Sequence, residues 1–322
     1  MKKIIFTLVT MVVLLFGWAP ELLAQKYPDR PITLVIPMTP GDALDITGRL
    51  IGEKLSNLLK VPIVPLNKPG ATGTIAADMV VKAKKDGYTI LLANNPSIVH
   101  TKILQPETVP YDPFKDLTPL GLSMGTPIPI VVRSGAPYKD FKELMDCAKK
   151  NPGKIRCGTP GMGSNGDFNV RIINMVAGVD MTSVPFKGAS PPVLALLGGH
   201  IEAASTGIVP LIPHIRSKML KGIVTSRNLP EFPDIPTLKQ LGYKQDLFEG
   251  WFAFFAPAGV PDEVIETLVP AIEKVVRDPT IYPKLLDLGM FLEYLPPDKL
   301  LAKMQEEYKT LGEVAQKFGM IK

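Results

Sequence analysis

The strongest constraint on the fold is a regular alternation of short apolar runs and helix-periodic segments, separated by turns that contain Gly and Pro. Residues 32–36 form a buried-strand run, and a Pro-Gly turn then leads into a segment at 44–59 whose apolar residues share one helical face. The rhythm continues with a strand at 61–66, a helix at 75–83 and a strand at 88–93. This order predicts a largely parallel sheet covered by helices.

A second unit with the same alternation follows residue 126. At about 150 residues per domain, a chain of 322 residues is long enough for two domains. We expect a discontinuous domain 1, residues 25–125 and 252–322, with domain 2, residues 126–251, inserted between its parts. From residue 126 onward the expected elements are strands at 128–132, 155–159, 201–205, 222–226 and 252–256, and helices at 141–148, 168–179 and 301–318.

The first 24 residues predict a cleaved secretory signal peptide. Lys2 and Lys3 precede an apolar stretch, and a small residue, Ala24, stands at the expected cleavage point. An uncleaved membrane anchor is the alternative, but the apolar run is shorter than the roughly 20 residues that a membrane span requires. No later stretch stays apolar over the roughly 18 residues of a candidate span. We therefore expect a soluble protein exported to the periplasm.

Composition excludes several classes of function. The chain has 2 Cys and 3 His, too few for a disulfide-dense scaffold or a Cys/His zinc array, and we expect no metal and no cofactor. The net charge is +5, but no run of Lys and Arg exceeds two residues, which argues against a nucleic-acid partner. Cys147 and Cys157 lie on an expected helix and the strand after it, and form either a disulfide or two buried thiols.

Signatures of catalysis are weak or missing. Residues 161–166 match G-x-G-x-x-G, but no clear ribose-binding acid follows about 20 residues later, as a dinucleotide site would require. Met162 stands where a nucleophile elbow around Ser164 would need Gly. The sequence also contains no P-loop and no H-E-x-x-H motif. We expect no enzymatic activity, and an exported esterase acting through Ser164 is the least favoured alternative.

Two Gly-rich turns are better candidates for a site. Each follows an expected strand and opens an expected helix, at residues 39–45 and 158–165. Free amide groups at helix N-termini attract anions, and ligands of open α/β sheets bind at this end of the strands. Two such turns that face each other across a cleft would clamp a carboxylate. The alternative is that both are simply tight turns.

Short motifs in a fixed order extend over nearly the whole expected mature chain. They are YPDRPI at 27–32, the Pro-Gly turn that ends in Asp45, NKPGATG at 67–73, DGYT at 86–89, VPFKG at 184–188, PDIPT at 233–237, and Trp251 followed by APAGVP at 256–261. In this combination the chain resembles the Bug (TctC-type) solute receptors, the extracytoplasmic receptors of tripartite tricarboxylate transporters.

The resemblance implies a two-domain α/β periplasmic binding protein of type II, the Venus-flytrap kind, with no catalytic activity. Each domain is expected to be a mainly parallel sheet flanked by helices, and the domains to close over the ligand about crossovers near 123–126 and 250–252. The implied ligand is a small organic acid, for example a dicarboxylate or an aromatic acid. We expect a monomer that delivers this ligand to membrane permease subunits, or alternatively a sensory receptor whose partner is a kinase.

Two positions depart from the family pattern and place carboxylates near the expected anion site. Asp42 replaces the second Gly of a Pro-Gly-Gly turn, and Asp167 stands where family members often carry His. Both fit helix caps, because Asp42 with Asp45 and Ser164 with Asp167 have near capping-box spacing. If they contact the ligand instead, the receptor prefers a neutral or amine-bearing compound.

The turns and the resemblance together give the expected ligand-binding residues. They lie in the two turns, after the third strand, on the helix that follows the second turn and in nearby loops; for the aromatic residues, core packing is the alternative. The set is Thr39, Gly41, Asp42, Ala43, Leu44, Asp45, Asn94, Asn95, Gly161, Met162, Gly163, Ser164, Asn165, Asp167, Phe168, Phe186, Thr206 and Trp251.

Overall fold

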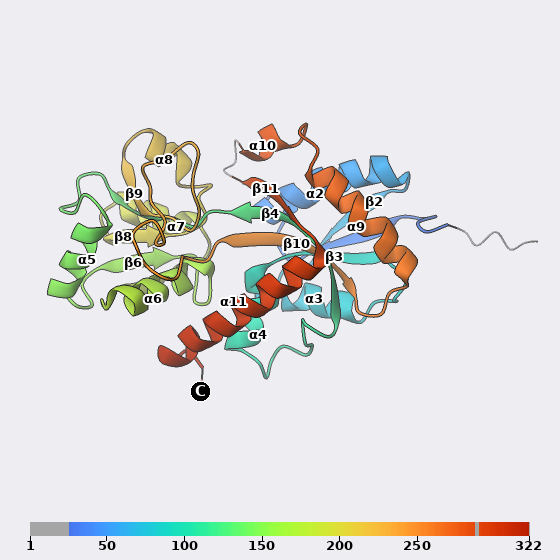
Figure 1. The fold of residues 1–322 in the computed structure, drawn as a ribbon, viewed down its shortest axis with the longest axis horizontal. Coiled ribbons are helices and arrows are strands. Elements are labelled where there is room, and N and C mark those ends of the chain that lie inside the picture. Colours follow the sequence, from blue (N-terminus) through green and yellow to red (C-terminus); the bar gives the residue numbers. More distant parts are fainter. Residues whose placement is uncertain (1–25, 287–289, 322) are drawn as a thin grey trace, which may run out of the picture.

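Two α/β domains lie side by side along the longest axis of the molecule and are joined by extended strands (Figure 1). This computed structural model describes residues 26–286 and 290–321. The expected signal peptide, residues 1–24, lies outside the described residues. Within the described ranges, none of the helices has the length and apolar character that a membrane span would need.

The first sheet gathers strands from the early and late parts of the chain. In spatial order it contains β11 (Phe291–Leu295), β4 (Leu117–Thr126), β10 (Gly250–Pro257), β3 (Thr89–Asn94), β1 (Ile32–Ile36) and β2 (Ile63–Asn67). β1 pairs in parallel with β2 and β3. β10 pairs antiparallel with both β3 and β4, and β11 pairs antiparallel with β4.

The second sheet is built from the middle of the chain. In spatial order it contains β7 (Thr182–Pro185), β6 (Arg156–Thr159), β8 (Ala203–Ser205), β5 (Ile130–Arg133) and β9 (Leu220–Val224). β6 runs parallel to β7 and β8, whereas β5 runs antiparallel to β8 and β9. The strands expected between residues 128 and 226 each overlap one of these, and β7 is an addition to them.

The two-domain α/β architecture is confirmed, but each sheet is mixed rather than mainly parallel. In the first sheet the connection between the domains explains the mixture. β3 and β4 both run toward the second domain, and β10 returns from it, as the pairing of Gly250 with Thr126 shows. A returning strand that enters between two outgoing strands must pair antiparallel with both.

Amphipathic helices cover both sheets. α2 (Ala43–Leu59) and α9 (Asp262–Val276) contribute Leu44, Ile51 and Leu268 to an apolar core that also contains Leu34 of β1. Further helical segments of the first domain are η1 (Ala71–Gly73), α3 (Thr74–Val81), η2 (Pro96–His100), α4 (Thr101–Leu104) and α10 (Tyr282–Leu286), and those of the second are α5 (Phe141–Lys150), α6 (Asn165–Ala177), α7 (Ser190–Leu197) and α8 (Ile212–Arg216).

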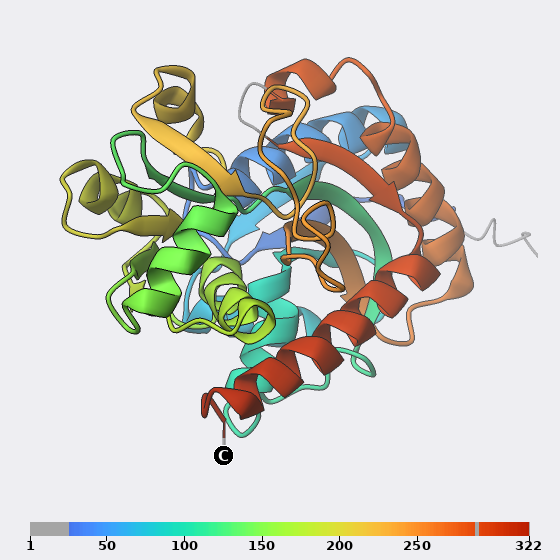
Figure 2. The same ribbon diagram turned by 60° about the vertical axis from the view of Figure 1, so that its left-hand side comes forward.

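The C-terminal helix α11 (Pro297–Lys317) packs against both domains. Leu300, Met304 and Leu311 keep the expected three–four spacing and are buried. The helix contacts β4, η2 and α4 of the first domain and α6 of the second, and Figure 2 shows it running along one side of the molecule. Phe168 of α6 belongs to the same buried cluster, so the apolar core on this side is continuous between the domains.

Candidate functional site

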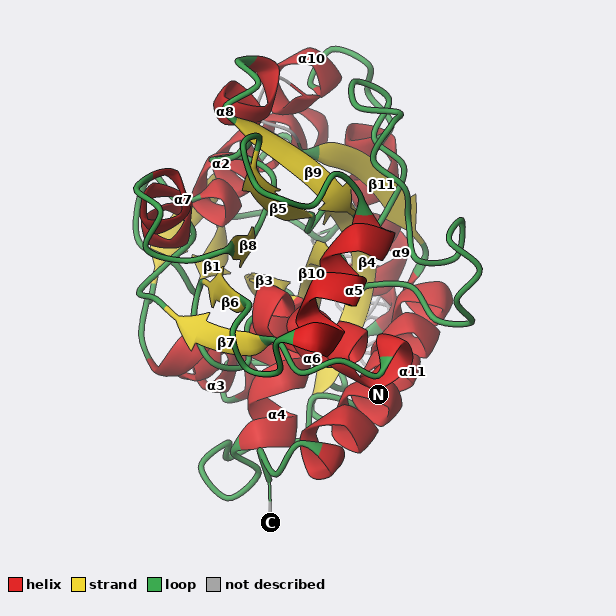
Figure 3. Ribbon diagram, turned by 90° about the vertical axis from the view of Figure 1, so that its left-hand side faces the viewer, coloured by secondary structure: helices red, strands yellow, loops and turns green. Residues whose placement is uncertain are grey.

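The two Gly-rich loops lie where the domains meet. Figure 3 views the molecule from the second domain and shows β1, β3 and β6 on one side of the connecting strands β4 and β10. β11 and α11 lie on the other side. Because the loops follow the carboxyl ends of β1 and β6, they lie on the side away from β11, as expected for ligand loops of an α/β sheet.

The first loop ends in a capped helix. Gly41 has a φ of +85°, a left-handed conformation that favours glycine, and it turns the chain from β1 into α2. Asp42 is the N-cap of α2, and its carboxylate accepts a hydrogen bond from the Leu44 amide at 2.9 Å. Thr39, Gly41 and Asp42 are exposed, so this loop is accessible from solvent.

Asp45, in the first turn of α2, is 2% exposed. Its carboxylate accepts hydrogen bonds from the Gly41 amide and from Nδ2 of Asn67, each at 2.9 Å, and from Nε of Arg49 at 3.0 Å. Burial by itself raises the pKa of this carboxyl, but the donors outweigh burial, and the net pKa lies below its ordinary value. Asp45 therefore stays ionised and fixes the loop from inside the protein.

The second loop has the same arrangement. Gly163 has a φ of +76°, and Ser164 is the N-cap of α6, accepting a hydrogen bond from the Asp167 amide at 3.3 Å. Asp167 is 2% exposed, and its carboxylate accepts from the Gly163 amide at 3.0 Å and from Oγ of Ser183 at 2.6 Å. Nη2 of Arg171 lies 3.2 Å from the same carboxylate and compensates its charge.

The two loops thus share one sequence pattern: Gly, a capping residue, two residues, Asp, three residues and Arg, at 41–49 and 163–171. In both copies the Asp carboxylate accepts from the Gly amide before it and pairs with the Arg after it. Each cap was predicted separately. The repeat itself was not predicted, although its spacing is visible in the sequence. The repeat removes the concern that Asp167 opposes an anion, because its charge is neutralised within its own domain.

Asp42 differs from these two aspartates. Among the described residues no cation pairs with its carboxylate, which accepts only the Leu44 amide. Its pKa is raised, chiefly because surrounding protein atoms desolvate the group; the Leu44 amide lowers the pKa and the charge of Asp45 raises it. Asp42 therefore presents an exposed carboxylate at the start of α2, without a cation partner among the described residues.

Several residues expected to contact ligand are buried. Asn95, Phe168, Thr206 and Trp251 are buried, and Leu44 belongs to the core of the first domain. For the two aromatic residues the core alternative therefore describes the structure. Oγ1 of Thr206 donates to the Ala189 carbonyl at 3.4 Å, within the second domain.

Other candidates keep accessible surface. Met162 is 73% exposed at the tip of the second loop, whereas its neighbours Gly163 and Asn165 are buried. Asn94 is half-buried at the end of β3, and its Oδ1 accepts a hydrogen bond from the Ser97 amide at 3.1 Å. The expected residues with accessible surface are Thr39, Gly41, Asp42, Ala43, Asn94, Gly161, Met162, Ser164 and Phe186.

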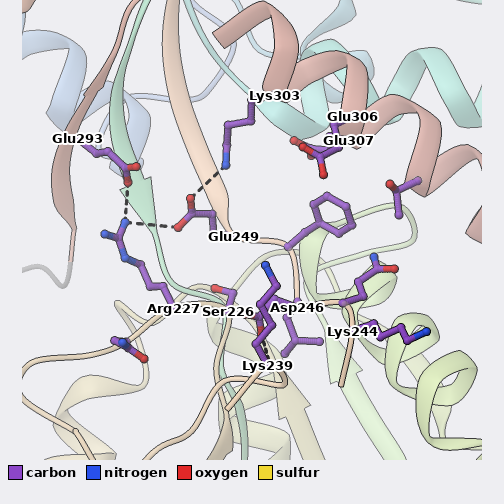
Figure 4. Close-up of a pocket in the computed structure, with 15 residues that line it drawn as sticks. Ser226, Arg227, Lys239, Lys244, Asp246, Glu249, Glu293, Lys303, Glu306 and Glu307 are labelled. Atoms are coloured by element: carbon purple, nitrogen blue, oxygen red, sulfur yellow. Dashed lines mark hydrogen bonds and ion pairs between the residues drawn. The ribbon is translucent and has the colours of Figure 1, made fainter. Parts of the chain in front are cut away.

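A cavity of about 680 Å³ lies between the segment 226–249, β11 and α11, and charged side chains cross it (Figure 4). Nη1 of Arg227, from the second domain, lies 2.8 Å from Oε2 of Glu293 on β11 and 3.4 Å from Oε2 of Glu249. Nζ of Lys303 on α11 lies 3.3 Å from Glu249. Burial most strongly affects the pKa of Glu249, and despite both cations the net pKa is raised.

The two cysteines are free thiols, so the alternative of two thiols describes this structure. Cys147 is half-buried and Cys157 is buried, and burial raises the pKa of the Cys157 thiol. Across residues 26–286 and 290–321, no group of three or more His, Cys, Asp or Glu side chains is arranged to hold a metal ion.

Comparisons with known proteins agree with this fold. Residues 47–320 match the family described as the tripartite tricarboxylate transporter family receptor, TctC. The chain is 27% identical over 305 residues to Protein BugT of Bordetella pertussis, with 94% of each chain covered. The solved structure of MatC from Rhodopseudomonas palustris with bound malate is 29% identical, with a TM-score of 0.74, over 89% of this chain and 99% of that one.

A further solved structure, R. palustris Rpa4515 with adipate, is 27% identical, with a TM-score of 0.77, over 91% of this chain and 98% of that one. The fold that the chain shares with these proteins is that of solute receptors and not of enzymes. The chain therefore belongs to the tripartite tricarboxylate transporter family receptors, which are periplasmic solute-binding proteins.

Proposed function

We propose that this receptor captures a small organic acid between its two domains and delivers it to membrane permease subunits. The repeated loop is the observation that carries the proposal. In both copies an Arg of the same helix and a loop amide compensate the charge of the buried Asp, so that charge does not cancel the positive end of the helix. Two such helix N-termini, one from each domain, can each attract a carboxylate.

Ligands of similar receptors support a carboxylate. MatC binds malate and Rpa4515 binds adipate, and both compounds carry two carboxylates. Two loops, one from each domain, suit a ligand with two acidic ends. We propose accordingly that residues 25–125 with 252–322 and residues 126–251 move as two bodies that close over the ligand.

The charge of Asp42 favours a second ligand class. Its carboxylate is accessible and has no counter-ion among the described residues, so it favours a ligand with an amine or hydroxyl donor facing α2. Such a compound would still present a carboxylate to the loop before α6. An amino or hydroxy dicarboxylic acid combines both features.

Removal of residues 1–24 would release the receptor into the periplasm. It would also leave a chain with one tryptophan, which permits a fluorescence assay. Of the 2 Trp in the sequence, Trp18 lies in the signal peptide, so the processed chain has Trp251 as its single tryptophan. Trp251 is buried on β10, one of the two connecting strands, so we expect its fluorescence to change on domain closure.

The test is a titration of the processed chain with mono- and dicarboxylates, aromatic acids, acidic amino acids, and neutral and cationic analogues, followed by Trp251 fluorescence and thermal unfolding. A true ligand at about 100 times its Kd adds about 2.7 kcal/mol to the free energy of unfolding. We expect one class of acids to give both signals. Binding of neutral or cationic compounds alone would contradict the carboxylate proposal. Delivery is tested by uptake of that acid in cells with and without the receptor.

A further inference from the structure

A buried polar cluster behind the second loop is centred on His100 and Glu307, which are not among the residues expected to contact ligand. Glu307, on α11, is 2% exposed, and three donors surround its carboxylate. Nε1 of Trp251 donates to Oε2 at 2.7 Å, and Nδ2 of Asn95 donates to Oε1 at 2.8 Å. Nε2 of His100 lies 2.7 Å from Oε1, and His100 is itself 1% exposed. A buried carboxylate held by three donors is well compensated.

The cluster reaches the second loop directly. Nδ1 of His100 lies 2.8 Å from the carbonyl oxygen of Gly163. Nδ2 of Asn95 donates to Oδ1 of Asn165 at 2.9 Å, in the first turn of α6. His100 and Asn95 belong to the first domain, whereas Gly163 and Asn165 belong to the second. The position of the loop before α6 therefore depends on residues that the first domain and α11 supply.

Packing enforces the same contact. A Cβ atom built on Gly163 would lie 2.3 Å from Cδ1 of Leu104, so a larger residue at this position would displace the end of the Leu104 side chain. The ring of His100 also packs edge-to-face on Phe168 of α6, with the ring centroids 5.0 Å apart. His100 is thus fixed on two sides while its Nδ1 faces the loop.

The hydrogen-bond geometry fixes the number of protons in the pair. The Gly163 carbonyl can only accept, so Nδ1 of His100 must carry a hydrogen. Nε2 faces Glu307, and one proton must lie between them, either on the imidazole or on the carboxyl group. In both cases the His100–Glu307 pair is neutral as a whole, and the donor to Gly163 is retained.

We propose that His100 and Glu307 are positioning residues for ligand binding: they hold the loop 161–165 in its binding conformation through the Gly163 carbonyl. The inference rests on the proposed function of that loop. Neither residue touches the ligand. Glu307 acts through His100, because it fixes the ring so that the Nδ1 hydrogen points at Gly163.

Two substitutions of His100 separate positioning from stability. His100→Asn places an amide nitrogen near the position of Nδ1, so it keeps the bond to Gly163 and loses the contact with Glu307. His100→Gln reaches the position of Nε2, so it keeps Glu307 satisfied and loses the bond to Gly163. If His100 had a merely structural role, the less stable of the two variants would also bind ligand more weakly. If His100 positions the loop, the less stable variant, His100→Asn, binds ligand more tightly than His100→Gln.

The measurements are Kd for the acid that wild type binds, thermal unfolding, and hydrogen exchange of residues 161–166 without ligand. We expect His100→Gln to weaken binding about tenfold and to lose loop protection while melting near wild type. We expect His100→Asn to bind within about threefold of wild type although it melts lower, because Glu307 loses a donor. Exchange of residues 39–45 is the internal control and stays unchanged in both.

Affinity that follows melting temperature in both variants, or loop exchange equal to wild type in His100→Gln, would overturn the proposal. The exchange experiment needs no ligand, so it tests the positioning even if none of the acids binds. If the loop loses protection in His100→Gln but wild type binds no carboxylate, the proposed function fails and the positioning of the loop stands.

Discussion

At the residue scale, Asp42 is the side chain that we propose discriminates between ligands by their charge. Asp42→Asn keeps an N-cap acceptor for the Leu44 amide and removes the charge. Succinate and L-aspartate share a skeleton and differ by one amine, so they form the matched pair of ligands. We expect the variant to bind succinate more tightly and L-aspartate more weakly, each by about 1 kcal/mol or roughly fivefold, as calorimetry would show.

A remote control is Asp146→Asn on α5, where the carboxylate pairs with Lys142 on the surface of the second domain. It should leave both affinities unchanged. If Asp42→Asn shifted both ligands in the same direction, Asp42 would act on the helix end and not on the charge of the ligand.

Asp45 gives a prediction about pH. Its folded pKa lies below the ordinary value, so its stabilising effect is complete above an unfolded pKa of about 3.9 and is lost as pH falls through the folded pKa. Asp45→Asn should lower the free energy of unfolding at pH 7 by about 1–3 kcal/mol. Its loss of stability between about pH 5 and pH 2 should be shallower than that of wild type. Urea unfolding across this range is the measurement, and parallel curves would exclude the role of Asp45.

At the element scale, local pattern predicted α2, α3, α5, α6 and α11 and the buried strands other than β4, but it did not predict α4, α7 or α8. α2, α6 and α11 bury apolar residues at three–four spacing, and the pattern located each within a few residues. β4, β7 and β11 were not predicted. β7 and β11 lie at sheet edges and have no fully buried residue, so neither alternation nor an apolar run marks them. β4 is mostly buried, but Pro119 and Gly121 interrupt its apolar run. The antiparallel pairing of β10 with β3 and β4 depends on the path of the chain between the domains, and no short stretch of sequence contains that information.

The candidate site divides in the same way. The two Gly-rich turns were found because a Pro-Gly turn between a strand and a helix is a local signal. The partners that fix them were not found: His100 is 63 positions from Gly163, and Glu307 is 207 positions from His100. Sequence alone gives no reason to join residues so far apart, and isolated His residues are more often structural than functional.

The start of α6 allows an element-scale test with two glycines of the same helix. Gly163 precedes the N-cap and Gly178 is the C-cap, with φ values of +76° and +62°. Alanine at Gly178 meets no atom within 4 Å, so Gly178→Ala should lose only about 1 kcal/mol of conformational energy. Alanine at Gly163 also meets Leu104. Gly163→Ala should therefore lose more stability than Gly178→Ala, because the end of the Leu104 side chain must shift, and it should lose ligand affinity as well.

Urea unfolding and ligand titration of both variants check this expectation. Equal effects on stability would mean that the loop moves away from Leu104 at no energetic penalty. In that case the contact between the loop and α4 would not help to fix the binding conformation.

At the scale of the whole molecule, the charged cavity lies beside β11 and α11, and the first loop follows β1 on the other side of the connecting strands (Figure 3). The first loop is exposed, and Met162 of the second loop is 73% exposed. Rotation about β4 and β10 that narrows the ligand side must widen the opposite side. The pair of Arg227 with Glu293, at 2.8 Å, joins the domains on that opposite side and therefore favours the open state.

Arg227→Gln should shift the receptor toward closure. It removes the ion pair between the domains and leaves Glu249 and Glu293 as like charges across the cavity. Of the two cations that pair with these carboxylates, only Lys303 remains. We expect small-angle scattering of the ligand-free variant to show a more compact particle. We also expect a lower Kd, by up to about tenfold, because less free energy is needed to reach the closed state. Salt should reduce the effect, since these side chains are partly exposed.

Arg277→Gln is the matched control, because it removes an Arg–Glu pair that lies within α9 and its C-cap and does not join the domains. It should change neither the scattering curve nor Kd. Weaker binding by Arg227→Gln would show that the pair supports the closed state instead. An unchanged scattering curve together with unchanged Kd would show that closure is governed elsewhere. The buried contacts of His100 with the Gly163 carbonyl and of Asn95 with Asn165 would then be the polar links to examine between the first domain and the ligand loop.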